Sequence, residues 1–317
     1  MRMKKYKVAR RSVRTTTTDP VHQKHDKGYK GLLSKTHHFM HFLTKYIDAD
    51  WVKTINENDL TLIDKTFIDA DFKQTESDVI YKLKLKDREI IFYILLELQS
   101  SVDFTIPFRL LRYMTALLRR EFRNTSENER KSKDYRLPAV VPIILYNGSD
   151  NWSAVRSFKE YLQGYEEFGD YLIDFKYLLF DLNRNTEETI LSTEQLLDMV
   201  FALDKTKRHN MERIIKITLE KYRRMSDDDK EDLDNWMEYI WLSDIEDACE
   251  KNKILSNFKR GEITDMMSGL SLMIEEEVKK EKVEIAKSLL DVLDVDTIAK
   301  KTKLTVEEVE ALKEENK

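Results

Sequence analysis

SDVIYKLKLKDREIIFYILLELQ, residues 77–99, is the stretch that decides the fold of this chain. Its first half, residues 77–86, alternates apolar and polar side chains, as a strand with one buried face does. Its second half contains an unbroken apolar run from Ile90 to Leu96, which is typical of a strand buried on both faces. Polar Asp87 and Arg88 separate the two runs, so the stretch predicts a β-hairpin with these residues at its tip.

The predicted turn also sets a register for the hairpin. An even-length turn centred on Asp87 and Arg88 puts Asp78 directly opposite Glu97, where Cβ atoms lie about 4.5–5.5 Å apart. Two carboxylates at this distance repel each other, and a divalent cation removes the repulsion. Mg²⁺ prefers such carboxylates, completed by water and phosphate oxygens. The hairpin therefore predicts a metal site, with two alternatives: the register is off by one residue, or one carboxylate points into solvent.

Three further strands are predicted around the hairpin. One lies within residues 60–72, one runs from Ala139 to Leu145, and one from Phe175 to Leu182. Pro142 lies inside the second of these and cannot donate a ladder hydrogen bond. We therefore expect an edge position or a bulge at Pro142.

Five segments of the chain, taken in order, resemble the recombination-promoting nuclease family, whose members are also described as YhgA-like putative transposases. They are HDKGYKGLL (25–33), ESDVIYKLKL (76–85), FYILLELQSS (92–101), PFRLLRYM (107–114) and LPAVVPIILYNG (137–148). Asp78 and the run Glu97-Leu98-Gln99 are similar to the D…(D/E)-x-K signature of the PD-(D/E)XK nuclease superfamily. Gln99 departs from it, because the superfamily signature has lysine there, although the E-x-Q form resembles what this family commonly carries.

This resemblance implies an α/β fold: a PD-(D/E)XK restriction-endonuclease-like core with a mixed central sheet, followed by a helical C-terminal region. It also implies a metal-dependent DNA endonuclease that hydrolyses phosphodiester bonds and is linked to the promotion of recombination.

The resemblance further implies roles for single residues. Asp78, Glu97 and the carbonyl of Leu98 would hold Mg²⁺, or Mn²⁺ or Ca²⁺ in its place. Gln99 would orient a water molecule by hydrogen bonding but brings no positive charge. Two more candidates, His25 and Asp26, belong to the segment that resembles the family's opening motif, which implies accessory residues beside this site. The alternative is an ordinary N-terminal helix turn, in which Asp26 interacts favourably with the helix dipole.

Two other functions agree with the same residues. A catalytically inactive member of the fold would bind DNA or a partner protein, and a transposase-like protein would transfer strands. The intact pair Asp78 and Glu97 favours the nuclease over the inactive member. No additional sequence feature supports strand transfer.

A helix predicted from Pro107 to about Arg123 follows the second strand of the hairpin. Its arginines share one arc about 100° wide and are Arg109, Arg112, Arg119, Arg120 and Arg123. An adjoining arc, expected to face the core, contains Phe108, Leu111, Thr115, Leu118 and Phe122. Because no acid shares the arginine arc, we expect it to contact a DNA backbone, the alternative being a solvated helix face.

The composition predicts a charged, helix-rich protein of a reducing compartment. Charged residues make up 36% of the chain, and only 7 glycines and 4 prolines argue against a loop-rich all-β fold. The one cysteine, Cys249, excludes an intrachain disulfide. No apolar run approaches the roughly 20 residues that span a membrane, and the basic N-terminus lacks the apolar segment of a secretory signal. We therefore expect a cytoplasmic protein without a membrane partner.

The net charge of −5 hides an uneven distribution. Residues 1–14 carry seven Lys and Arg residues and no acid, and residues 103–136 carry nine against five acids. Residues 225–250 carry eleven acids and one lysine. This asymmetry allows a basic DNA-binding face within an acidic chain.

We expect four parts along the chain. Residues 1–24 form a flexible basic arm, residues 25–185 the nuclease core, residues 186–270 a helical region and residues 271–317 a helical tail. Two short helices of the tail, 295–302 and 306–314, resemble a helix-turn-helix pair with a capping box at Thr305 and Glu308. The second of them is acidic, which favours packing or homo-oligomer formation over DNA contact.

Overall fold

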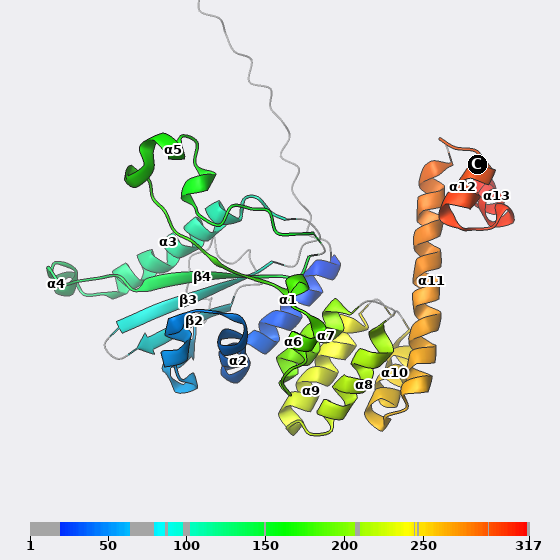
Figure 1. Ribbon diagram of the computed structural model, residues 1–317, viewed down its shortest axis with the longest axis horizontal. Coiled ribbons are helices and arrows are strands. Elements are labelled where there is room, and N and C mark those ends of the chain that lie inside the picture. Colours follow the sequence, from blue (N-terminus) through cyan, green and yellow to red (C-terminus); the bar gives the residue numbers. More distant parts are fainter. Residues whose placement is uncertain are drawn as a thin grey trace, which may run out of the picture. The chain divides into compact units, whose positions relative to one another are not determined.

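The computed structural model describes residues 20–63, 79–85, 88–97, 102–148, 150–206, 210–243, 245, 247–290 and 292–315. The contacts divide the chain into two compact units, residues 1–186 and residues 187–317. Each unit is described by itself below, and Figure 1 labels helices and strands of the first unit and helices of the second.

A five-stranded mixed sheet forms the centre of the first unit. Its strands lie side by side in chain order: β1 (Leu60–Leu62), β2 (Val79–Leu85), β3 (Arg88–Glu97), β4 (Ala139–Tyr146) and β5 (Leu178–Asp181). The first three strands are antiparallel, whereas β3, β4 and β5 are parallel. The connections explain the strand directions. A short hairpin joins the antiparallel strands β2 and β3, while longer crossovers that contain helices join the parallel strands. The predicted mixed α/β fold is therefore confirmed.

Five helices among the described residues belong to the first unit along with this sheet. They are α1 (Pro20–Leu33), α2 (Thr36–Tyr46), α3 (Ile106–Asn124), α4 (Glu127–Arg130) and α5 (Tyr165–Phe168). Single 3₁₀ turns are η1 (Asp50–Thr54), η2 (Glu57–Asp59), η5 (Lys159–Tyr161), η6 (Gly169–Tyr171) and η7 (Leu182–Arg184). In Figure 1, α1 and α2 lie on one side of the sheet and α3 on the other.

The hairpin forms as predicted, but its predicted register is wrong by two residues. Val79 pairs with Ile94, where the predicted register pairs it with Leu96. Arg88, which was expected at the tip, is part of the ladder and pairs with Leu85. Only two residues therefore connect the strands, the commonest length for a hairpin loop.

The register also changes the expected arrangement of carboxylates. A shift by two residues keeps every position on its own face of the sheet. The described ladder does not follow the register that sets Asp78 directly opposite Glu97, and Asp78 itself lies outside the described residues. In the described ladder, the partner of Glu97 is Tyr146 of the parallel strand β4.

One face of the sheet packs against α2 through aromatic rings. Tyr81 of β2 stacks on Phe39 with 4.1 Å between ring centroids. Phe180 of β5 meets Phe42 edge-on with centroids 5.3 Å apart. Because Phe39, Phe42 and Tyr81 are fully buried, this layer excludes water from that face.

The other face of the sheet packs against α3, but not through the predicted arc of that helix. The buried residues of α3 are Ile106, Pro107, Leu110, Tyr113 and Leu117. In the predicted arc, Phe108 and Phe122 are 49% and 43% exposed, and Thr115 is exposed as well. Both arcs recur with helical spacing, so the pattern alone does not choose between them. The direction in which the chain leaves β3 decides which one faces the sheet.

Two leucines of α3 test this assignment. We expect Leu110→Ala to lower the free energy of unfolding by about 2–5 kcal/mol, because it opens a cavity at a fully buried position. Leu118→Ala, in the predicted arc and half-buried, is the control and should cost about 1 kcal/mol or less. Urea unfolding followed by circular dichroism measures both. Equal losses would show that both arcs pack in the core.

Pro142 lies within a strand that has neighbours on both sides. It pairs with Tyr93 of β3, while pairing of β4 with β5 begins only at Ile143. The first half of β4 is therefore an edge, which is where a missing N–H is tolerated. The expected edge position is confirmed for this half of the strand.

The described residues of the second unit form helices and their connecting turns, without a strand, which confirms the helical C-terminal region. Its helices are α6 (Glu187–Ile190), α7 (Leu196–Lys205), α8 (Met211–Tyr222), α9 (Asp227–Trp236), α10 (Ala248–Arg260), α11 (Ile263–Leu289), α12 (Val295–Thr302) and α13 (Val306–Glu315), with a π-helical turn, η9 (Met237–Trp241), after α9. No helix in the described part of the chain is both long enough and apolar enough to cross a membrane.

The helix pair α12–α13 packs on the C-terminal part of α11 through Ala286, Ile298 and Val309, all fully buried. The predicted capping box is present: Glu308 accepts the backbone N–H of Thr305 at 2.9 Å, and the Thr305 hydroxyl accepts the backbone N–H of Glu308 at 3.2 Å. The pair thus has a packing role within the unit, and homo-oligomer formation through it stays a prediction.

Candidate active site

Three parallel strands end side by side at one edge of the sheet. Glu97, the last residue of β3, pairs with Tyr146, the last residue of β4. Tyr146 in turn pairs with Asp181, the last residue of β5. Paired positions of neighbouring strands belong to the same face, and Tyr146 is part of the core beneath α3. The register therefore places Glu97, Tyr146 and Asp181 in one row on the face that α3 covers.

The predicted metal ligands lie mostly outside the described residues. This holds for Asp78, Leu98 and Gln99, while only the backbone of Glu97 is described. Positions 25 and 26 belong to α1, which packs against β3, but the side chains of His25 and Asp26 are not described. The metal site therefore stays a prediction, located by its strand rather than by its side chains.

Arg109, the first arginine of the predicted DNA-binding arc, is engaged within the protein. Its Nη1 lies 2.8 Å from Oδ2 of Asp103, and the two side chains are 25% and 20% exposed. Burial raises the pKa of Asp103, but hydrogen bonds from Thr105 and Arg109 outweigh it, so this pKa lies below its ordinary value. Arg109 thus fastens the loop after β3 to the first turn of α3. It does not present an uncompensated charge to a phosphate.

The other arginines of the arc divide into two kinds. Arg120 has a side chain only 26% exposed, and its Nη1 lies 3.8 Å from the carboxylate of Glu121. Lys82 of β2 lies 3.7 Å from the same carboxylate, so Glu121 is enclosed by two cations. Arg112, Arg119 and Arg123 are exposed. These three are the exposed arginines of the arc, and contact of the arc with DNA stays a prediction.

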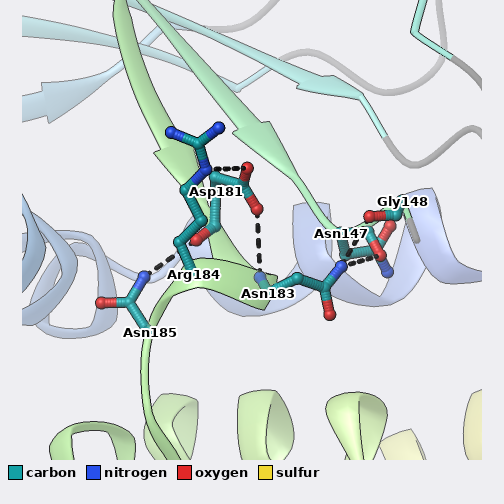
Figure 2. Close-up of polar contacts among 6 residues, drawn as sticks. All are labelled: Asn147, Gly148, Asp181, Asn183, Arg184 and Asn185. Carbon is teal, nitrogen blue, oxygen red and sulfur yellow. Dashed lines mark hydrogen bonds and ion pairs between the residues drawn. The ribbon is translucent and has the colours of Figure 1, made fainter. Parts of the chain in front are cut away.

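A polar cluster at the end of β5 was not among the site residues predicted from the sequence. Asp181 has a side chain only 5% exposed, and its Oδ2 lies 3.2 Å from Nε of Arg184, whose side chain is 61% exposed. The other oxygen, Oδ1, accepts the backbone N–H of Asn183 at 3.1 Å and caps the turn η7. Asn185 closes the cluster by donating its Nδ2–H to the carbonyl of Asp181 at 2.9 Å (Figure 2).

This cluster is tied to the loop that follows β4. Nδ2 of Asn183 donates to the carbonyls of Asn147 and Gly148 at 3.0 and 2.6 Å (Figure 2). The side-chain amide of Asn183 therefore joins the loops that follow β4 and β5. The signal in the sequence is the run DLNRN, residues 181–185, directly after a buried strand. Its importance depends on β5 being parallel to β3, which the local pattern does not show.

Comparison with known proteins identifies a matching family and several similar proteins. A family model described as "Putative transposase, YhgA-like" matches residues 23–232. The recombination-promoting nuclease RpnD of Escherichia coli O157:H7 is 27% identical over 134 residues, which cover 42% of this chain and 47% of that protein. From strain K12, the inactive recombination-promoting nuclease-like protein RpnE is 30% identical over 135 residues, covering 42% of this chain and 41% of that protein. The recombination-promoting nuclease RpnA of strain K12 is 28% identical over 127 residues, covering 40% and 41%.

The matched part of the chain thus spans less than half the length of each of these three relatives. No solved structure matches the chain.

Proposed function

This chain belongs to the family of YhgA-like putative transposases, and from that membership we propose that it is a metal-dependent DNA endonuclease with a PD-(D/E)XK-type core. Relatives in the comparison are named recombination-promoting nucleases, which supports a nuclease at the level of the family. The proposal extends this to hydrolysis of DNA phosphodiester bonds by the present chain.

The observation that carries the proposal is the position of Glu97. It is the last residue of the central strand β3, at the edge where two further parallel strands end. The loop directly after it leads into α3, which carries the exposed arginines. A carboxylate at the end of a strand and an arginine-bearing helix that follows it in the chain are parts that a phosphodiester cleavage site uses.

In the proposed site, the donors are hard oxygens: the carboxylates of Asp78 and Glu97 and the carbonyl of Leu98. Such donors fit Mg²⁺. A bound Mg²⁺ supplies polarisation of the scissile phosphate and a lowered pKa for a coordinated water. The side chain of Gln99 orients the attacking water by hydrogen bonding, and its amide carries no charge. Arg112, Arg119 and Arg123 contribute the attraction for the phosphate backbone.

A plasmid assay tests this function. Purified full chain is incubated with supercoiled plasmid in Mg²⁺, in Mn²⁺ and with excess chelator. We expect nicked and linear products only with a metal present. Intact plasmid under all three conditions would exclude the endonuclease.

Two observations keep an inactive DNA-binding protein as the second candidate. The relative RpnE is named inactive, and Gln99 occupies the position of the superfamily lysine. Retarded migration of a labelled duplex without cleavage would identify this function. Strand transfer, which the family description suggests, would instead yield joined products in the plasmid assay.

The two kinds of arginine in α3 give a matched test of the DNA contact. We expect Arg112→Ala to weaken binding to unrelated duplexes equally and to flatten the slope of log K against log salt by about 0.9, because one phosphate contact is lost. Arg109→Ala should leave that slope unchanged and lower stability instead, since Asp103 loses its partner. Fluorescence anisotropy over a salt series measures the slopes. Loss of affinity for one duplex only would show that Arg112 reads bases.

A further inference from the structure

We propose that Arg184, held in place by the buried carboxylate of Asp181, is a phosphate ligand for DNA at the carboxyl edge of the parallel strands. The inference rests on the proposed function and adds a contact that lies outside both the hairpin and α3. It assigns a role to the polar cluster after β5.

The geometry of the pair leaves the arginine free to bind a second anion. Nε of Arg184 lies 3.2 Å from Oδ2 of Asp181, and the arginine side chain remains 61% exposed. Figure 2 shows the two terminal nitrogens of Arg184 beyond Nε, and the dashed line to the carboxylate starts from Nε. Among the described residues, Asp181 is the only ion-pair partner of Arg184. The two terminal amino groups form the planar fork that binds two phosphate oxygens at once.

Asp181 has the properties of a positioning residue. Its side chain is nearly excluded from water, and one oxygen is already engaged by the backbone N–H of Asn183. The second oxygen therefore has a fixed position from which to hold Nε. Ion pairs with an exposed arginine contribute only about 0–1 kcal/mol to stability, so the main effect of this pair is on where the guanidinium points.

The surrounding loops hold the pair rigidly at the same edge as Glu97. Asn183 bridges the carbonyls of Asn147 and Gly148, and Asn185 donates to the Asp181 carbonyl. Two inter-strand spacings separate β5 from β3, about 10 Å. A phosphate within a few nucleotides of the cleaved bond therefore lies within reach of Arg184.

The test compares Arg184→Ala with Arg213→Ala in the full chain. Arg213 is also 61% exposed and also paired with a carboxylate, Glu187 at 2.9 Å, but it lies in the second unit. Both changes remove the positive charge of an exposed arginine that is paired with a carboxylate. Binding to a labelled generic duplex is measured by anisotropy over a salt series, with Ca²⁺ in place of Mg²⁺. We expect Arg184→Ala to flatten the salt slope by about 0.9 and Arg213→Ala to leave it at the wild-type value.

Two further variants separate charge from orientation. Arg184→Lys keeps the charge but lacks the fork, so we expect the wild-type slope with weaker binding. Asp181→Asn keeps an oxygen for the backbone N–H of Asn183 but removes the charge that holds Nε. We expect it to weaken DNA binding while circular dichroism stays that of the wild type. Wild-type affinity in Asp181→Asn would overturn the positioning role.

The outcomes distinguish this inference from the proposed function. Wild-type slopes in both Arg184→Ala and Arg213→Ala, with metal-dependent nicking intact, would overturn the inference and leave the endonuclease standing. A wild-type chain that neither binds the duplex nor nicks plasmid would overturn both.

Discussion

We expect Asp78→Ala and Glu97→Ala each to abolish nicking of supercoiled plasmid in Mg²⁺, while the far-UV circular dichroism spectrum remains that of the wild type. This is the expected result because each substitution removes one of two anionic ligands, and a single carboxylate with a carbonyl holds Mg²⁺ far more weakly. Neither change should unfold the protein, since removing a negative charge from a pair of carboxylates relieves repulsion in the metal-free state.

Two controls sharpen this prediction. Asp174→Asn removes a carboxylate charge in the same unit, at a side chain that accepts hydrogen bonds from Ser157 and the backbone of Lys159, and should nick plasmid like the wild type. Calorimetric titration with Mg²⁺ in the absence of DNA provides a readout that does not depend on activity. The binding heat of the wild type should be lost in both alanine variants. Nicking at the wild-type rate by Asp78→Ala and Glu97→Ala would eliminate this pair as the metal site.

Gln99→Ala lowers the rate of nicking at saturating Mg²⁺ by about 10²-fold, the second large effect that we expect. A catalytic hydrogen bond to the attacking water is worth about this factor when it is lost. Because glutamine does not bind the metal through its side chain in the proposed site, the Mg²⁺ concentration for half-maximal rate should stay unchanged. Single-turnover rates over a metal series measure both quantities.

Gln99→Lys tests the same position from the other side. A lysine beside two carboxylates competes with the cation, so the Mg²⁺ concentration for half-maximal rate should rise. The rate at saturating metal should stay level or increase, since positive charge now faces the reacting phosphate. An inactive wild type that gains nicking through Gln99→Lys would place this chain with its inactive relatives. If neither substitution alters an active wild type, the water is oriented by another group.

Arg109 and Arg184 are both paired with a carboxylate, but they differ in whether the guanidinium can also bind a phosphate. In Arg109, the carboxylate of Asp103 binds a terminal nitrogen of a largely buried side chain, so the positive charge is neutralised within the protein. In Arg184, the acid holds Nε of an exposed side chain, so the fork still faces solvent. The number of basic residues in a stretch of sequence does not separate these two cases. They are separated by which guanidinium nitrogen contacts the carboxylate: Nη1 in Arg109 and Nε in Arg184.

The sequence by itself determined the local elements. The alternation in residues 77–86 and the apolar run from Ile90 to Leu96 predicted the hairpin, and β2 and β3 form there. The capping box at Thr305 and Glu308 was predicted and is present. These features depend on residues a few positions apart, and periodicity and capping are properties of such short segments.

Only the tertiary structure decided the register of the hairpin, the arc of α3 that faces the sheet, and the row formed by Glu97, Tyr146 and Asp181. A change of one residue in the tip moves every cross-strand pair by two, and both apolar arcs of α3 have helical spacing. The row joins strands that are far apart in the chain and requires that β3, β4 and β5 run parallel. Strand direction and helix facing are set by non-local packing, because each element satisfies its own periodicity in more than one arrangement and only its neighbours select among them.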